Sequence, residues 1–145
     1  MHRHSAAVRA FAQGIALIAI LLVTVDGARG QVADHPQARL VTLDPKADQY
    51  VRVLGGPPAT VTMRSGYVVL APGKSVGEHS TESYEEAVIV LEGDGEMVIA
   101  GGPTLCLTAW SVAYCPPGTK HNVTNTGKST LRYLYVVCAA PRPKE

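Results

Sequence analysis

Two stretches of this chain decide its fold: residues 73–93, which read GKSVGEHSTESYEEAVIVLEG, and residues 116–125, which read PPGTKHNVTN. The first stretch carries His79 and Glu86, and the second carries His121. A lone histidine is more often a hydrogen-bonded structural residue than a ligand. Two histidines and a glutamate, each at a fixed distance from glycines and prolines that mark turns, favour a shared site instead.

Around these stretches the chain alternates short apolar runs with glycine and proline turns, and apolar residues at helical spacing are almost absent. Runs rich in β-branched and aromatic residues predict an all-β chain. Strands of four to nine residues at roughly even spacing favour a sandwich or a barrel. The expected strands are 38–43, 50–54, 60–64, 66–70, 86–91, 96–100, 105–108, 111–115, 121–125 and 130–138.

Both stretches resemble the two sequence motifs of the cupin family. The first motif is Gly, five residues, His-x-His, three or four residues, Glu, six residues, Gly; the second is Gly, five residues, Pro-x-Gly, two residues, His, three residues, Asn. The matching residues are Gly73, His79, Glu86 and Gly93, then Pro116, Gly118, His121 and Asn125. The resemblance covers about residues 64–139 and implies the cupin double-stranded β-helix, or jelly-roll barrel. It says little about the reaction, since this fold hosts many activities.

The chain departs from the family at two positions. Trp110 stands where the second motif has its first glycine, and Thr81 stands where the first motif has its second histidine. Cupins of the usual type bind metal with three histidines and one glutamate. The resemblance therefore implies that His79, Glu86 and His121 are metal ligands, while the neutral hydroxyl of Thr81 is a poor one.

The residue types support a metal site independently of the family. Two imidazoles and one carboxylate with open positions are typical of non-haem Fe²⁺ and also serve catalytic Zn²⁺, with Mn²⁺ and Ni²⁺ left open. His79 and Thr81, two apart on a strand, would face the same side. Glu86 would meet them from the next strand and His121 by barrel closure, with ligand atoms within about 4 Å of one another. The alternative is a metal-free cupin whose pocket binds an organic ligand by hydrogen bonds and apolar walls.

Two weaker candidates concern the substrate. Arg64 precedes the first motif and could clamp an acidic substrate, with a surface role as the alternative. Thr81 would lie beside the open face of the metal. Two functions follow: a metal-dependent enzyme with oxygenase, isomerase or lyase chemistry on a small organic molecule, or a non-catalytic binder of a small molecule or sugar. The sequence names neither the substrate nor the native metal.

Residues 1–30 have the features of a cleaved signal peptide: a basic head, an apolar run at 11–25 and small residues before the cleavage position. The apolar run is short for an uncleaved membrane anchor, which needs about 20 residues. We therefore expect a periplasmic or secreted protein whose single domain is residues 31–145. Loss of three basic residues and one acidic residue with the signal changes the formal net charge from +1 to −1. No basic stripe remains, so nucleic acid and membrane are not expected partners.

Two further expectations concern packing. Cys106, Cys115 and Cys138 all lie in apolar runs, which predicts either three buried thiols or one disulfide and one free thiol. Residues 88–91 and 134–138 are apolar at every position, as strands buried on both faces would be. An outward apolar face on the last strand predicts a homodimer.

Overall fold

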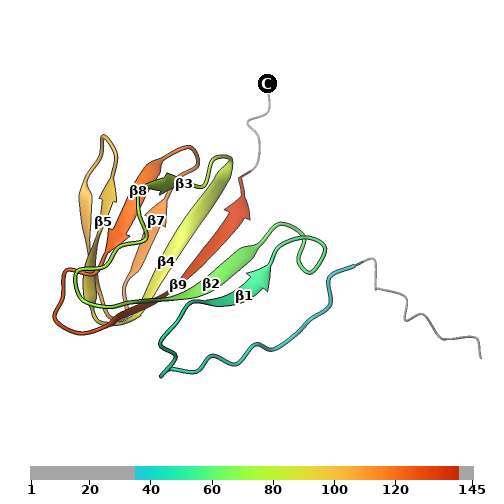
Figure 1. Ribbon diagram of the computed structural model, residues 1–145. Helices are drawn as coiled ribbons and strands as arrows, with labels where there is room; N and C mark the ends of the chain where they lie inside the picture. The colour runs from blue at the N-terminus through green and yellow to red at the C-terminus, as the bar shows by residue number, and fades with distance from the viewer. Residues whose placement is uncertain (1–34, 141–145) are drawn as a thin grey trace, which may run out of the picture. The chain divides into compact units, whose positions relative to one another are not determined.

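The computed structural model describes residues 35–140, and every regular element in that range is a β-strand. Figure 1 labels most of them. The nine strands are β1 (Val51–Gly55), β2 (Arg64–Leu70), β3 (His79–Ser80), β4 (Tyr84–Glu92), β5 (Asp94–Ile99), β6 (Thr104–Thr108), β7 (Val112–Cys115), β8 (Lys120–Thr124) and β9 (Leu131–Ala139). The all-β expectation is confirmed.

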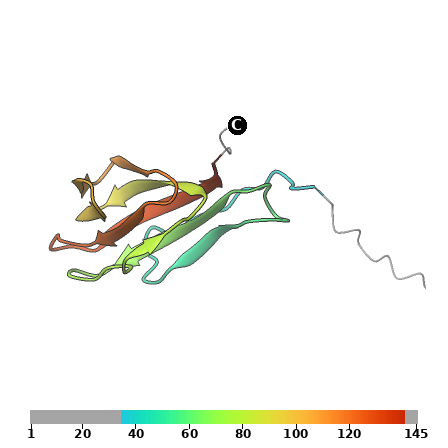
Figure 2. The same cartoon turned by 90° about the horizontal axis from the view of Figure 1, so that it is seen from above.

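The strands form two antiparallel sheets. The larger sheet has five strands in the order β1-β2-β9-β4-β7, and the smaller has four in the order β3-β8-β5-β6. Successive strands after β2 pass repeatedly from one sheet to the other, so chain neighbours are seldom sheet neighbours. Figure 2 shows the long strands of the larger sheet running nearly side by side beneath the shorter strands.

The core lies between the two inner faces. Its fully buried members include Val88 and Val90 of β4, Met97 of β5 and Val123 of β8. Between them, alternate residues of β4 point to the outer face and are only half-buried, as the two-residue period of a strand requires. The runs expected to be buried on both faces are therefore fully buried on one face only.

Asn125 joins the end of β8 to the larger sheet. Its side chain has no exposed surface, its amide donates to the carbonyl oxygens of Leu70 and Ser129, and its own carbonyl accepts from the backbone N–H of Gly127. A buried polar side chain is tolerated when its groups are paired in this way. The last residue of the second motif therefore has a structural role.

The smaller sheet ends before the larger one does. Its edge strand β3 has only two residues, whereas the larger sheet continues past β9 to β2 and β1. A cavity of about 540 Å³ opens over the inner faces of β2 and β9 where the covering strands stop. This end of the sandwich positions the candidate site.

Two expected strands are absent and one strand was not expected. Residues 38–43 and 60–63 form no strand, since the first segment has no partner in either sheet and the second leads into β2 through a loop. Strand β3 was not expected, because two residues carry no readable alternation.

The cysteines also differ from expectation. All three are free, and only Cys115 is buried. Cys106 is exposed because it lies on the outer face of β6, which is an edge strand, and Cys138 is half-buried on the outer face of β9. The expected burial of all three thiols is wrong for Cys106 and only partly met by Cys138.

Within residues 35–140 no helix is long and apolar enough to cross a membrane. The predicted signal peptide, residues 1–30, lies outside the described part of the chain, so export and the domain boundary at residue 31 stay predictions.

Candidate metal centre

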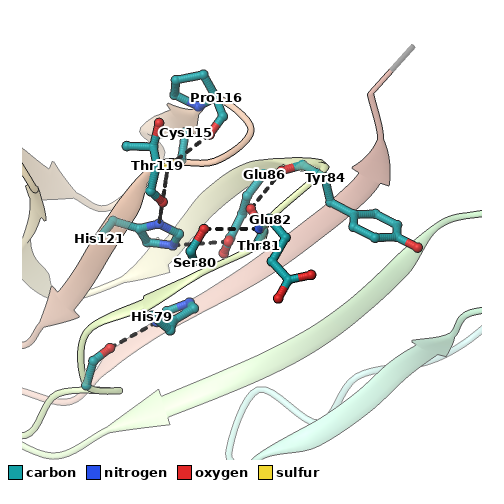
Figure 3. Close-up of polar contacts among 11 residues, drawn as sticks. His79, Ser80, Thr81, Glu82, Tyr84, Glu86, Cys115, Pro116, Thr119 and His121 are labelled. Carbon is teal, nitrogen blue, oxygen red and sulfur yellow. Dashed lines mark hydrogen bonds and ion pairs between the residues drawn. The ribbon is translucent and has the colours of Figure 1, made fainter. Parts of the chain in front are cut away.

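The two sheets bring His79, Glu86 and His121 together at the inner end of the cavity. His79 of β3 and His121 of β8 are directly paired across the strand ladder of the smaller sheet. Glu86 reaches them from β4 of the larger sheet. Figure 3 shows the His121 ring directed at Glu86, with His79 on the opposite side of the gap. The expected arrangement is therefore reversed: His121 is the strand neighbour of His79, and Glu86 faces both from the opposing sheet.

The three side chains offer ligand atoms that all lie within 4.8 Å of one another. Within this cluster, Nε2 of His121 lies 3.1 Å from Oε2 of Glu86. The two imidazole centroids are 4.4 Å apart, with ring planes inclined at 58°. The cluster is slightly wider than the expected 4 Å. Because Glu86 and His121 are already close, metal binding would require the exposed His79 to move toward them.

Both imidazoles are held through Nδ1. The Nδ1 of His79 lies 2.9 Å from the carbonyl oxygen of Gly77, and that of His121 lies 3.2 Å from the carbonyl oxygen of Thr119 (Figure 3). A carbonyl oxygen can only accept, so each of these contacts is a hydrogen bond in the tautomer that carries the proton on Nδ1. Each neutral ring then keeps the lone pair on Nε2, and backbone acceptors of this kind commonly orient metal-binding histidines.

Two of the three ionisable side chains at the centre are almost out of contact with water. His121 is 0% exposed and Glu86 is 5% exposed. Burial raises the pKa of Glu86 above its usual value, while the neighbouring His121 and His79 act in the opposite direction. Burial, followed by the charge of Glu86, also raises the pKa of the Cys115 thiol, which lies 3.2 Å from Nδ1 of His121. A cation at the centre would compensate the desolvated carboxylate.

The donor set fits a divalent metal ion. The Nε2 atom of His121 is buried and has no hydrogen-bond partner in residues 35–140, although Oε2 of Glu86 lies 3.1 Å away. With the proton on Nδ1, these atoms are two acceptors facing each other. Two ligands at right angles on an ion with bonds of about 2.1 Å would lie about 3.0 Å apart. A metal ion would therefore bind both atoms at close to their present separation. The alternative is a second proton on His121, which Nε2 would donate to Glu86.

Thr81 serves the turn between β3 and β4. Its hydroxyl donates to the carbonyl oxygen of Tyr84 at 2.7 Å, and its carbonyl oxygen accepts from the Tyr84 N–H at 2.9 Å. Thr81 also lines the cavity with His79 and Glu86. The position where the family has its second histidine is thus held by a turn residue whose hydroxyl proton is already donated to the backbone.

Arg64 lines the same cavity from the first position of β2. Three tyrosines that were not among the expected site residues line it as well: Tyr50, Tyr133 and Tyr135. The hydroxyls of Tyr50 and Tyr135 are 3.0 Å apart, and burial, with the Tyr50 hydrogen bond second, raises the pKa of Tyr135 to about 12. Alternation along β9 signals that Tyr133 and Tyr135 share a face, but nothing in the sequence places Tyr50 beside them.

Several charged and aromatic residues close to the motifs in sequence lie away from the site. Lys120 faces outward and forms an exposed ion pair with Glu78, and Glu85 accepts a hydrogen bond from Tyr114. Trp110 adopts φ 68° and is 86% exposed. This left-handed conformation suits the glycine of the family motif, so the substitution changes the turn residue while the turn itself is kept.

Comparison with known proteins agrees with the fold. The family model described as "Cupin domain" matches residues 66–137. A protein of Thermotoga maritima named "Oxalate-binding protein" is 34% identical over 68 residues, which are 47% of this chain and 55% of that protein. The chain thus matches about half the length of this curated relative.

Solved structures with the same architecture include a "Cupin 2 conserved barrel domain protein" from Salinispora arenicola, with 26% identity, TM-score 0.58 and coverage of 72% of this chain and 91% of that one. A second, described as a "predicted oxalate decarboxylase" from Thermotoga maritima, has 21% identity, TM-score 0.52 and coverage of 69% and 100%. At that identity the likeness shows the fold alone. The motifs, the two-sheet architecture and these matches together place the chain, through residues 66–137, in the cupin family.

Proposed function

We propose that this protein binds one divalent metal ion through Nε2 of His79, Nε2 of His121 and the carboxylate of Glu86, and holds a small organic molecule in the adjoining cavity. The observation that carries the proposal is the convergence of three ligand atoms within 4.8 Å, with both Nδ1 atoms held by backbone carbonyls. Three protein ligands leave coordination positions open, as in catalytic metal sites.

Each side chain has a separate task in this proposal. His121, fully buried and fixed through Nδ1, sets the inner position of the ion. Glu86 supplies the negative charge that a dication requires. His79 lies at the cavity wall and completes the ligand set from β3, the edge strand of the smaller sheet. When bound, the ion would polarise an oxygen atom of the organic molecule. Apolar residues on β2 and β9 would exclude water around the rest of it.

The reaction is proposed only as a class. Open coordination positions beside an apolar cavity are compatible with oxygenase, isomerase or lyase chemistry on a small organic molecule, with Fe²⁺, Zn²⁺, Mn²⁺ or Ni²⁺ as the ion. The relative named "Oxalate-binding protein" supports a small carboxylate as the bound molecule. If the following test finds no bound metal, it favours the alternative, which is metal-free binding of a small molecule or sugar without catalysis.

The test is metal content after equilibrium loading. Purified protein is loaded anaerobically with Fe²⁺, Mn²⁺, Zn²⁺ or Ni²⁺, dialysed and measured by elemental analysis, beside His79→Ala, His121→Ala and the control His35→Ala. His35 is exposed and remote in sequence from the motifs. We expect about one ion per chain in the wild type and the His35 variant, and loss of most of it in the other two, since too few strong ligands remain. Equal, negligible retention by all four proteins would refute metal binding.

A further inference from the structure

Arg64 lies on the same inner sheet face as Glu86, opposite the two histidines of the smaller sheet. In the larger sheet Arg64 pairs with Val137 of β9, and Val137 pairs on its other side with Glu86 of β4. The three residues therefore form one row across adjacent strands, which places the backbones of Arg64 and Glu86 about 10 Å apart. All three line the cavity, so a molecule lying along this row would reach Arg64 at one end and the metal ligands at the other.

The Arg64 side chain is supported from two sides. A Cβ atom added to Gly56 would lie 2.9 Å from Nε and 3.1 Å from Cγ of Arg64, so the arginine stem rests directly on the Gly56 backbone. Its guanidinium carbon lies 5.0 Å from the centroid of the Tyr84 ring, a distance at which a cation is attracted to an aromatic face. Figure 3 shows Tyr84 projecting away from the histidines. Because the arginine is already held in place, it loses less conformational entropy on binding a ligand than an unsupported side chain would.

No acid of the described chain neutralises Arg64. The ion pairs within residues 35–140 involve Lys120, His121 and Arg132, and Glu86 is the only acidic residue among those that line the cavity. With a dication at the centre, Glu86 leaves a net charge of about +1 there, and Arg64 adds a second positive charge at the far end of the row. Most of the remaining lining is apolar.

We propose that Arg64 binds one carboxylate of a short dicarboxylic acid whose other carboxylate lies at the metal centre. The proposal rests on the proposed function, since the ion supplies the second positive charge. A guanidinium binds a carboxylate through two parallel hydrogen bonds, and dicarboxylic acids of different chain length test how far apart Arg64 and the ion hold the two carboxylates. Tyr84 acts as a positioning residue that supports Arg64 without lining the cavity.

Calorimetric titration of the metal-loaded protein with oxalate, succinate, glutarate and adipate tests the assignment. We expect at least one acid to bind the wild type, and Arg64→Gln to bind it at least about tenfold more weakly, since a charge-assisted pair contributes roughly this much. Arg52→Gln is the control: it removes the same charge from neighbouring β1, outside the cavity lining, and should bind as the wild type does. The monoamide of the tightest acid should also bind about tenfold more weakly to the wild type.

The support is tested separately. Tyr84→Phe keeps the aromatic face and should bind the acid as the wild type does, whereas Tyr84→Ala should weaken binding while metal content stays unchanged. No binding of any of the four acids, or equal affinity of wild type and Arg64→Gln, would overturn the proposal. Failure of the proposed function is distinguishable, since it appears as a wild type without metal. In that case the ratio of wild-type to Arg64→Gln affinity, measured on the metal-free protein, still decides the role of Arg64.

Discussion

Single residues determine how the two imidazoles present their nitrogen atoms. Gly77 and Thr119 each accept the Nδ1 proton of a histidine two residues along the chain. Both acceptors are backbone carbonyls, and for His121 the Cys115 thiol also lies 3.2 Å from Nδ1. This local arrangement leaves both Nε2 atoms available to one ion, even though His79 is exposed and His121 is buried.

Thr81 is the residue at which the chain departs from its family. Its side chain lines the cavity beside His79 and Glu86, so Thr81→His should place a third imidazole beside the open face of the ion. A fourth strong ligand should slow metal loss to a chelator by about tenfold or more, and any activity that needs the open position should fall. Thr81→Val, which loses the hydroxyl but adds no ligand, is the matched control. Chelator-induced loss at the wild-type rate in Thr81→His would contradict the predicted position.

The sequence predicts the identity of these residues better than their arrangement. His79, Glu86 and His121 are recognisable because glycines and prolines at fixed distances surround them. Their pairing is not, since spacing along the chain does not say which strands are neighbours, and His121 turned out to be paired with His79 while Glu86 lies on the other sheet. Tyr50 could not be predicted at all, because its place at the cavity depends on the path of the segment before β1.

Among the elements, every strand except β3 was predictable, because each is a run rich in β-branched or aromatic residues that is bounded by turn residues. The failures have a common cause. Residues 38–43 and 60–63 have the composition of strands but no partner in either sheet, and composition alone does not supply a partner. Strand β3 is defined by its pairing with β8 and has no signal of its own. The element that carries His79 is thus the one that the sequence does not show.

The turn between β4 and β5 depends on Gly93. It has φ 80°, and a Cβ atom there would collide with the carbonyl oxygen of Thr130 and lie 2.9 Å from the Cα of Leu131. Gly101 has a similar φ of 71° but nothing within 4 Å of the added atom. Gly101→Ala should therefore lower the free energy of unfolding by about 1–2 kcal/mol for the backbone conformation alone. Gly93→Ala should lower it by a further 1–3 kcal/mol or so, because backbone atoms must move.

Urea denaturation of the two metal-free variants and the wild type measures this difference. Both substitutions incur the same conformational cost. The difference between their free energies of unfolding therefore measures the effect of the close approach of β9 to the turn. Equal destabilisation by the two variants would show that the turn and β9 are not packed as described.

At the scale of the whole molecule, the outer face of the larger sheet is apolar. Leu134 of β9, Ile89 of β4 and Val112 of β7 lie in one row across adjacent strands, and Val112 is 68% exposed. Exposed apolar patches of this kind often mark an interface. We predict a homodimer through this face, so that Leu134→Lys should give a monomer by light scattering at micromolar concentration. Val98→Lys, on the exposed face of the smaller sheet, should remain dimeric. A monomeric wild type would contradict the prediction.

Export is a second prediction at this scale. The basic head and apolar run of residues 1–30 predict cleavage after Gly30. Intact mass of the protein from its native host should correspond to a chain that begins at Gln31, in the periplasmic or extracellular fraction. A full-length chain that begins at Met1 in the membrane fraction would show that the segment is an anchor.

We propose that one ion joins the two sheets between His79, Glu86 and His121. Anomalous diffraction from crystals grown with Mn²⁺ or Zn²⁺ would locate that ion. Data collected on either side of the metal absorption edge locate the ion independently of the protein atoms. We expect one strong peak about 2.0–2.3 Å from Nε2 of His79, Nε2 of His121 and a carboxylate oxygen of Glu86, with His79 moved inward from its present position. A cluster without a peak at millimolar metal, or a peak bound through Nδ1 of either histidine, would contradict it.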